Sequence, residues 1–369
     1  MVQHSDLCMG CGGCEIVCPV GAIRIEMSAD GFWRPTINKT ICVDCGKCDS
    51  VCPVDVVQTN QAIQAYGFKS NDKQILRKSA SGGFGYELSK AMIGSSSVCS
   101  VEYDPSVCGP RHTVADSIEE LDKKRNSIYL QSYTVNGFRE ILKHENGVVF
   151  GSPCQISLLN NLLVQQKRRD KFLLIDFFCH GVPSYNVWKK YVDDHKEVFD
   201  LQPDVVFRSK QNGWGSFTIE CKTEEKSSYF DKAKDDDIFF RIFLENMALN
   251  KCCYSCPYHA NNSAADIRIG DLWGEKYKND TEGITGILAF TEKGRDAVSR
   301  MNVHGKLTYE TIDDVLAGQI QSDLPIPSCR EKLIKELQLE KTLHSINSSL
   351  IFRYKLTRKI NRLLGRNYI

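Results

Sequence analysis

The sequence predicts a mixed α+β or α/β protein with three parts: a small cysteine-rich unit, a larger unit built on a mixed β-sheet, and a helical C-terminal region. A repeated cysteine spacing indicates the first part, and an alternation of strand-like and helix-like segments indicates the second. The length of 369 residues, 42% of them hydrophobic, allows two or three units with buried cores. We expect the parts to cover residues 1–60, 61–78 (a linker), 79–300 and 301–369.

The cysteine repeat lies near the N-terminus and consists of two runs with the same spacing, each followed by proline. The runs are Cys8-x2-Cys11-x2-Cys14-x3-Cys18-Pro19 and Cys42-x2-Cys45-x2-Cys48-x3-Cys52-Pro53. With this spacing, three thiolates of one run bind one 4Fe-4S cluster and the fourth binds the other cluster. Zinc would have no use for the repeated fourth cysteine. The first cluster therefore takes Cys8, Cys11, Cys14 and Cys52, and the second takes Cys42, Cys45, Cys48 and Cys18, in a ferredoxin-like domain.

Segments after residue 79 alternate between strand-like and helix-like patterns. Phe84, Leu88 and Met92 follow the string 79–83 at helical spacing, which predicts an N-cap region and an amphipathic helix. Further helices are predicted at 156–163, 184–199 and 238–249, and strands at 98–103, 148–152, 172–179, 205–210, 217–222, 267–273 and 284–290. This order favours a partly parallel sheet. In the cysteine-rich unit, 22–26 and 33–37 predict a hairpin around Asp30-Gly31.

The charge balance gives no global preference for nucleic acid. The chain has 47 basic and 46 acidic residues, which leave a formal net charge of +1. The first residues have neither the basic start nor the apolar core of a signal peptide, and clustered thiols need a reducing compartment to remain available as ligands. We therefore expect a cytoplasmic protein.

The C-terminal tail is basic and amphipathic. No acidic residue follows Glu340, and basic residues interleave with apolar ones at roughly helical spacing between Ser349 and Ile369. Such a helix is compatible with peripheral contact with anionic lipid at the inner membrane face. It is equally compatible with packing on its own domain or on a partner protein, and the sequence leaves these alternatives open.

Seven short strings between Ser79 and Phe290 occur together in one known family. They are SASGG at 79–83, GSPCQ at 151–155, CHGVPS at 179–184, FRSK at 207–210, GW at 213–214, CYSC at 253–256 and IGDLWG at 269–274. Together they resemble the beta subunit of coenzyme F420-reducing hydrogenase and of F420-dependent dehydrogenases, in the form fused to an N-terminal ferredoxin. The resemblance implies a bound FAD, a third 4Fe-4S cluster, and transfer of reducing equivalents between the clusters and a substrate that accepts or donates hydride.

The resemblance also implies ligands for the third cluster. Cys253 and Cys256 form a CxxC pair, Cys179 matches a cysteine at a strand end in the family, and Cys154 is the best available fourth ligand. Cys154 and Cys179 are also compatible with small buried core residues, and Cys252 could replace one member of the pair. The main competing interpretation is a zinc site made of Cys252, Cys253, Cys256 and His259.

Flavin contacts are expected at two helix N-termini, whose backbone N–H groups suit a pyrophosphate. The first is Ser81-Gly82-Gly83 and the second is Ser152-Pro153-Cys154, with Gln155 in the same string. Ordinary helix capping is the alternative for both. His180, Arg208 and Lys210 are expected to tune the flavin or to pair with phosphate. Asp271 and Trp273 fit a structural role as well as a place in the site.

These features favour an iron-sulfur flavoprotein oxidoreductase. Clusters pass single electrons and a deazaflavin such as F420 or a nicotinamide takes hydride, whereas flavin is stable in one-electron and two-electron forms. The expected partners are a ferredoxin or another redox protein and a small-molecule hydride carrier or substrate. No feature of the chain fixes F420, so this molecule is F420, another flavin or nicotinamide, or a carbohydrate or tetrapyrrole intermediate. The alternative is a non-catalytic electron-transfer protein that connects a partner enzyme to ferredoxin, and the presence of flavin distinguishes the two. No catalytic residue is assigned.

Overall fold

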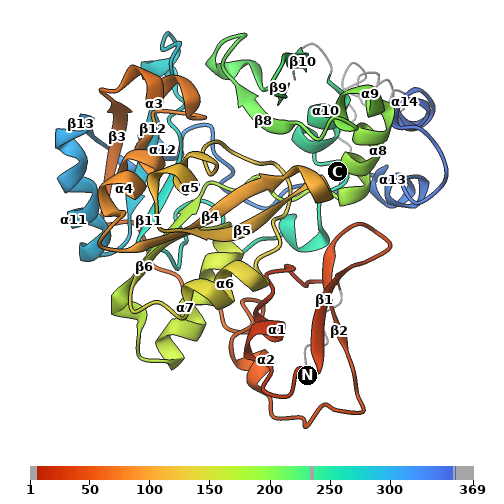
Figure 1. Cartoon of the computed structure of the whole chain (residues 1–369), viewed down its shortest axis with the longest axis horizontal. Helices are drawn as coiled ribbons and strands as arrows, with labels where there is room; N and C mark the ends of the chain where they lie inside the picture. The colour runs from red at the N-terminus through yellow and green to blue at the C-terminus, as the bar shows by residue number, and fades with distance from the viewer. Residues whose placement is uncertain (1–5, 233–236, 352–353, 355–369) are drawn as a thin grey trace.

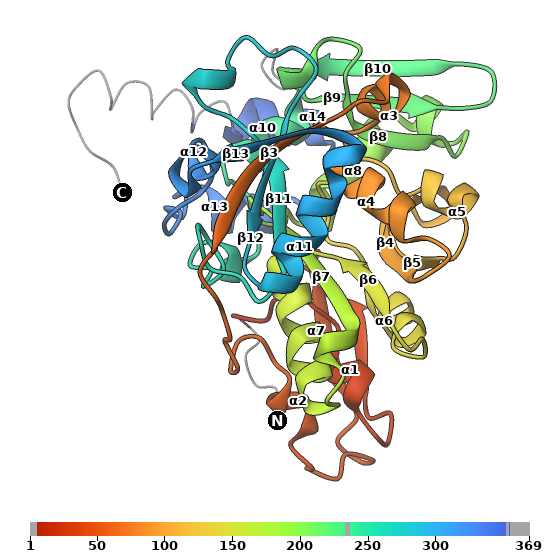
Figure 2. The same ribbon diagram turned by 90° about the vertical axis from the view of Figure 1, so that its left-hand side faces the viewer.

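An eight-stranded mixed sheet forms the centre of the molecule (Figures 1 and 2). The structure is a computed structural model that describes residues 6–232, 237–351 and 354. The strand order is β13-β3-β12-β11-β7-β6-β4-β5, in which β4, β6, β7 and β11 are mutually parallel and the other pairings are antiparallel. The strands are β3 (Gln64–Ser70), β4 (Ser97–Asp104), β5 (Gly109–Ala115), β6 (Gly147–Phe150), β7 (Phe172–Phe177), β11 (Ile267–Asp271), β12 (Thr285–Ala289) and β13 (Gly305–Glu310). The mixed sheet confirms the predicted fold class.

Helices cover both faces of this sheet, because each apolar face needs a second layer to exclude water. On one face α4 (Phe84–Met92) and α11 (Glu292–Arg300) pack through Phe84, Leu88 and Val298. On the other face α6 (Val135–Ile141) and α7 (Pro153–Gln165) pack through Phe138, Ile156 and Leu159. Shorter helices at the sheet margins are α3 (Lys73–Lys78), α5 (Ile118–Asp122) and α12 (Ile312–Leu316).

A second, smaller sheet with its own helices packs on the central unit. Its strands, in the order β10-β9-β8, are β8 (Asp204–Ser209), β9 (Thr218–Lys222) and β10 (Ser227–Lys232). The helices are α8 (Tyr185–Asp194), α9 (Lys196–Phe199), α10 (Ile238–Leu244), α13 (Arg330–Glu336) and α14 (Leu343–Ile346). Trp188, Phe207 and Phe239 are at the centre of this core. Ser184 caps α8 as predicted, because its hydroxyl accepts from the Asn186 N–H.

The N-terminal module lies at one end of the molecule, beside α7 (Figure 2). It contains α1 (Gly13–Val17), α2 (Lys47–Ser50) and the predicted hairpin, formed by β1 (Ile23–Met27) and β2 (Trp33–Ile37). Side chains of the central unit bind its main chain: Thr134 donates to the Cys11 carbonyl at 2.8 Å, and Asn161 donates to the Val56 carbonyl at 2.9 Å. These bonds hold the module in a fixed position.

Two predicted boundaries differ from the structure. Residues 61–78, predicted as a linker, form β3 and α3, and β3 is hydrogen-bonded on both sides, to β12 and β13. Residues 301–369, predicted to be helical, include β13. Four consecutive residues of β3 are buried, so it lacks the alternation that identifies a half-buried strand.

The predicted helix 238–249 ends at Leu244, because Asn246 adopts a left-handed conformation with φ 60°.

The predicted basic tail lies almost entirely outside the described residues, so its contact with lipid stays a prediction. Within the part of the chain that the structure describes, no helix is both long and apolar enough to cross a membrane.

Candidate redox site

The eight cysteines of the N-terminal module line two adjacent cavities. Cys8, Cys11, Cys14 and Cys52, which the spacing groups together, line the first. Cys18, Cys42 and Cys45 line the second together with Cys48, which also borders the first. The structure therefore brings together the same two sets of thiols that the sequence assigns to two clusters. The fourth cysteine of each run reaches the cavity of the other run, as the two-cluster pattern requires.

The loops around these cavities direct backbone N–H groups at sulfur. The Gly10 N–H donates to Cys8 Sγ at 3.4 Å, and the Ala22 N–H donates to Cys18 Sγ at 3.2 Å. Gly10 has φ 63°, and a Cβ there would lie 2.8 Å from the Trp33 carbonyl oxygen, so only glycine fits. N–H groups that point at cysteine sulfur stabilise the thiolate form, which is the form that binds iron.

Four more cysteines converge in the interior, next to the first cavity. Cys154 begins α7, Cys179 follows β7, and Cys253 and Cys256 lie in the loop after α10. Burial raises the pKa of Cys154 and of Cys256 to about 12 and also raises that of Cys179, and neighbouring thiols of this group raise all three pKa values further. A hydrogen bond with Cys252, followed by burial, raises the pKa of Cys253. The structure therefore places the four predicted ligands of the third cluster side by side.

Cys252 and His259, the two further ligands in the competing zinc interpretation, face different parts of the molecule. The Cys252 thiol points to the first-cluster loop, where it donates to the Cys8 carbonyl at 3.6 Å. His259 lines a neighbouring cavity of about 260 Å³. In the described part of the chain, no three His, Cys, Asp or Glu side chains come close enough to hold a single metal ion.

The first cavity and the interior thiols share one apolar wall. Met9 and Tyr258 are buried in this wall and contact Cys154 and Cys256. The Tyr258 hydroxyl donates to the Pro53 carbonyl at 2.9 Å. Burial is the main reason why the pKa of Cys11 is well above its usual value, and the nearby Cys154 contributes to the shift. The thiols therefore form a continuous series from the module into the interior.

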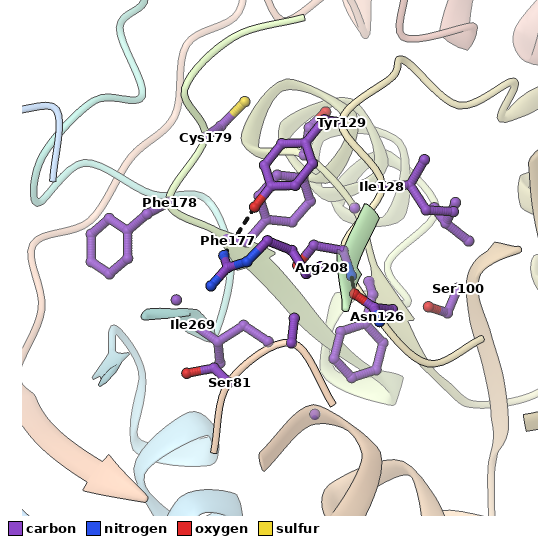
Figure 3. Close-up of a pocket in the computed structure, with 18 of the residues that line it drawn as sticks. Ser81, Ser100, Asn126, Ile128, Tyr129, Phe177, Phe178, Cys179, Arg208 and Ile269 are labelled. Carbon is purple, nitrogen blue, oxygen red and sulfur yellow. Dashed lines mark hydrogen bonds between the residues drawn. The ribbon is translucent and has the colours of Figure 1, made fainter. Parts of the chain in front are cut away.

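A cavity of about 320 Å³ opens at the end of this series (Figure 3), and we call it the large cavity. It lies at the carboxyl ends of β6, β7 and β11, which are parallel, so the segments after these strands meet at one edge of the sheet. Cys179 lines the cavity as well as belonging to the interior thiols. The wall is formed by residues from 79–86, 124–132, 150–155, 177–182 and 269–273.

Six of the nine predicted flavin contacts line this cavity, namely Ser81, Gly83, Ser152, Gln155, His180 and Arg208, and so do Asp271 and Trp273. The other three predicted contacts, Gly82, Pro153 and Lys210, do not line this cavity. A Cβ on Gly82 would lie 2.1 Å from the Phe68 carbonyl oxygen, so this glycine lets the segment 79–83 pack closely against the paired strands β3 and β12. Pro153 is buried at the start of α7. The Lys210 ammonium donates to the carbonyls of Leu76, Ser81 and Glu282.

Arg208 is held at the cavity wall by a buried ion pair. Its guanidinium donates to Asp271 at 2.8 Å and to the Tyr129 hydroxyl at 3.0 Å, the bond drawn in Figure 3. Burial opposes the charged form, but Tyr129 and Asp271 outweigh burial and raise the pKa of Arg208. Trp214 and Trp273 stack beside this pair with ring centroids 4.5 Å apart. The wall therefore presents one fixed cation in aromatic surroundings.

His180 is a half-buried residue of this wall. Burial lowers its pKa, and its Nε2 lies 2.6 Å from the side-chain oxygen of Asn246. The Phe243 ring packs against the His180 imidazole, with the two ring centroids 4.8 Å apart. His180 is therefore fixed in orientation.

Several polar groups of the cavity wall were missed by the sequence analysis. Ser79 Oγ, Arg125 Nε and Gln131 Oε1 are buried and have no hydrogen-bond partner within the described residues. Buried polar atoms are usually paired, so this arrangement suits a bound molecule that supplies the missing partners. Arg125 and Gln131 belong to the loop 124–132, which has no periodic pattern and therefore gave no sequence signal.

Comparison with known proteins agrees with the resemblance. Residues 144–315 match the model of the C-terminal part of the coenzyme F420 hydrogenase/dehydrogenase beta subunit, and residues 7–56 match the 4Fe-4S dicluster domain. The chain carries the C-terminal domain of the F420 hydrogenase/dehydrogenase beta subunit family. Together with the dicluster domain, this makes it an electron-transfer protein of oxidoreductase type. The match includes the four interior cysteines, His180, Arg208 and Asp271, whereas 79–86 and 124–132 lie outside it.

Two relatives of this F420 family extend the likeness over most of the chain. The beta subunit of coenzyme F420 hydrogenase from Methanococcus voltae is 24% identical over 261 residues, which are 68% of this chain and 85% of the relative. A subunit of the F(420)H(2) dehydrogenase from Methanosarcina mazei is 27% identical over 335 residues, which are 82% and 89% of the two chains. Among solved structures, a chain of the F420-reducing NiFe hydrogenase complex of Methanosarcina barkeri is 18% identical with a TM-score of 0.49, covering 79% of this chain and 94% of that one.

Proposed function

We propose that the chain is an iron-sulfur flavoprotein that passes electrons between its dicluster domain and a hydride carrier bound beside an FAD in the large cavity. Cys179 is the observation that carries the proposal, since it lines the cavity and also belongs to the interior thiols. Those thiols contact the wall of the first-cluster cavity. A route for electrons from the module to the cavity therefore needs no movement of the chain.

The eight module cysteines are proposed to hold two clusters as the spacing predicts, and Cys154, Cys179, Cys253 and Cys256 are proposed to hold a third. Four buried thiols with raised pKa values form an unfavourable site for negative charge when no cation is near. The irons of a cluster supply that cation, and their binding releases the thiol protons.

The cavity has properties expected of a flavin site. Its volume of about 320 Å³ lies within the usual range for cofactor pockets, and its position at the carboxyl edge of parallel strands is a common one for nucleotide cofactors. When bound, FAD supplies the exchange between one-electron and two-electron chemistry. Arg208, held by Asp271 and Tyr129, offers a fixed positive charge to an anionic group. The wall also includes the aromatic side chains of Phe177 and Trp273, on which a flat ring system can pack.

Iron and flavin contents test this function. Anaerobically reconstituted protein should hold about twelve irons per chain, from three four-iron clusters, and acid precipitation of the native protein should release FAD. Cys256→Ser should lower the iron content to about eight. Cys252→Ser is the matched control and should keep about twelve, because the Cys252 thiol already binds the Cys8 carbonyl. A wild-type value that stays near eight would exclude the third cluster.

A second candidate function is a non-catalytic protein that only connects a partner enzyme to a ferredoxin. It is favoured by the internal pairing of Gln155, whose amide binds Ser152 and Ser132 and so needs no cofactor. Native protein that releases no flavin, and gains no flavin absorbance on reconstitution, would favour this candidate. If flavin is present, anaerobic oxidation of reduced F420, compared with NADH and with a reduced ferredoxin, identifies the class of electron donor.

A further inference from the structure

The two cluster cavities of the module differ in what encloses them. The first is closed by Leu158 of α7 and lies against the buried Met9. Every residue that lines the second belongs to the module itself, from 18–23 and 42–48. Cys45 is exposed, the only such cysteine of the described residues. The second cavity therefore faces solvent. The module that contains it lies at one end of the molecule (Figure 1).

Apolar side chains are exposed around this second cavity. Val20 and Val43, which line it, are 42% and 61% exposed, and Ile41, next to the cysteine run, is 45% exposed. They come from two separate loops, so they form a surface and not a single protruding chain end. Exposed apolar groups that gather around a functional cavity are typical of a protein contact surface.

The charges near this surface are balanced. Lys39 and Lys47 are exposed on the same loop as the exposed Asp44 and the half-buried Asp49. The two positive and two negative side chains of this loop offset one another, so the loop itself carries no net charge. An apolar centre with a mixed charged rim is the usual composition of a transient protein interface.

We infer that the surface formed by Val20, Ile41, Val43 and Cys45 docks a redox protein whose own redox centre lies beneath a largely uncharged surface. This inference rests on the proposed assignment of Cys18, Cys42, Cys45 and Cys48 to the second cluster. One electron crosses the contact at a time: the partner's centre is oxidised by one electron and the cluster is reduced by one, or the reverse, and no atom or proton is transferred. The second cluster is thus the outer end of the electron route.

Oxidised rubredoxin, a small one-electron carrier with a single iron, serves as the probe. Full-length reconstituted protein is reduced with dithionite, desalted and mixed with rubredoxin, and the loss of rubredoxin colour gives the rate. We expect Val43→Glu and Val20→Glu to slow this reaction about tenfold below saturation, because a charge placed in an apolar contact must lose its water. Val303→Glu is the control, because Val303 is 79% exposed on a different part of the chain. All variants should keep their iron and should reduce dichlorophenolindophenol, which needs no docking, at the wild-type rate.

Rubredoxin reduction at the wild-type rate by both surface variants with intact clusters would overturn the inference, and so would an equal slowing by Val303→Glu. If Val43→Glu loses iron, Val43→Thr replaces it, because threonine keeps the branched shape of valine. Rubredoxin reduction by Val43→Thr should still be slower than by the wild type. Rates that drop steeply with added salt would contradict an uncharged contact. Sedimentation of the wild type as a dimer that Val20→Glu dissociates would assign the surface to a second copy of this chain instead. The reaction uses only the clusters, so it proceeds in protein without flavin, and failure of the flavin proposal is seen separately.

Discussion

The side-chain amide of Gln131 donates a hydrogen bond of 2.6 Å to the main-chain carbonyl of Met9. Met9 lies between Cys8 and Cys11 in the loop around the first cluster cavity, and Gln131 lines the large cavity. Gln131 is buried, so water does not compete for this bond. One side chain therefore joins the cluster loop to the wall of the proposed flavin site.

Replacing Gln131 tests this link. Gln131→Leu should lower the free energy of unfolding by about 1–3 kcal/mol, because it leaves the buried Met9 carbonyl without a donor. It should also slow reduction of the flavin by the clusters. Gln165→Leu is the matched control: Gln165 donates to the Ser50 carbonyl of the same module at 2.8 Å but is exposed and does not line the cavity. Denaturant unfolding and stopped-flow flavin reduction measure the two effects, and equal effects in both variants would contradict the role of Gln131.

The Arg208–Asp271 pair should be needed for flavin binding. Arg208→Met leaves the largely buried Asp271 charge uncompensated and should destabilise the fold by about 3–5 kcal/mol. Arg268→Met removes one partner of the Arg268–Asp176 pair, which is even more buried and does not line the large cavity. Both variants should therefore lose stability, but only Arg208→Met should lose affinity for FAD. Fluorescence titration with FAD separates them, and similar FAD affinity in the two variants would place flavin elsewhere.

His112 should make stability depend on pH. Burial lowers its pKa to about 4, and its two ring nitrogens lie 2.9 Å from the Phe150 carbonyl and 2.9 Å from the Ser132 hydroxyl. The unfolded chain, with an ordinary histidine pKa of about 6.5, binds a proton that the folded chain does not. The stability that neutral His112 contributes to the fold is therefore fully present above pH 6.5. It is lost as the pH falls towards 4, by up to about 1.4 kcal/mol in the free energy of unfolding per pH unit.

Thermal unfolding of the cluster-loaded protein between pH 7 and pH 5 checks this prediction. His112→Gln should flatten the fall in stability, whereas the control His304→Gln, in a turn after α11, should leave the fall unchanged. An unchanged slope in His112→Gln would show that other groups cause the acid sensitivity.

Replacing Gly82 should lower the stability of the fold and leave the affinity for FAD unchanged. A Cβ at this position would meet the Phe68 carbonyl oxygen at 2.1 Å and the Thr285 nitrogen at 2.5 Å, so Gly82→Ala forces the segment 79–83 away from β3 and β12. We expect a loss of about 1–3 kcal/mol in the free energy of unfolding. Gly215→Ala, where no atom lies within 4 Å of the added carbon, is the control. A stable Gly82→Ala variant with weakened FAD binding would restore the original flavin assignment.

Local patterns predicted the features that depend on neighbouring residues. The cysteine spacing grouped the thiols that line two cavities, because the ligand loops are short and their geometry is local. Strands such as β7 and β11 were predicted from short apolar runs. In contrast, β13 has a mixed burial pattern and depends on pairing with β3, more than 200 residues earlier. Such pairing leaves no signal in either segment alone.

The cavity was predicted only in part for a similar reason. Capping residues mark where α4 and α7 begin, but they do not tell whether the nearby backbone faces a ligand or another strand. Gly82 faces another strand, and Gly83 lines the cavity. Lys210 looked available for phosphate, yet three distant carbonyls surround its ammonium. Those contacts arise only when the whole chain is folded.

The position of β3 has a consequence for how the clusters deliver electrons. Eleven residues, 53–63, separate this strand from Cys52, the last cysteine of the second run, and the strand is hydrogen-bonded between β12 and β13. The module is therefore not a carrier on a flexible tether that swings between donor and acceptor. The spacing between clusters and cavity is set once, when the sheet forms. Because β3 lies between β12 and β13, only a truncation that extends into this strand would remove the link between those two strands.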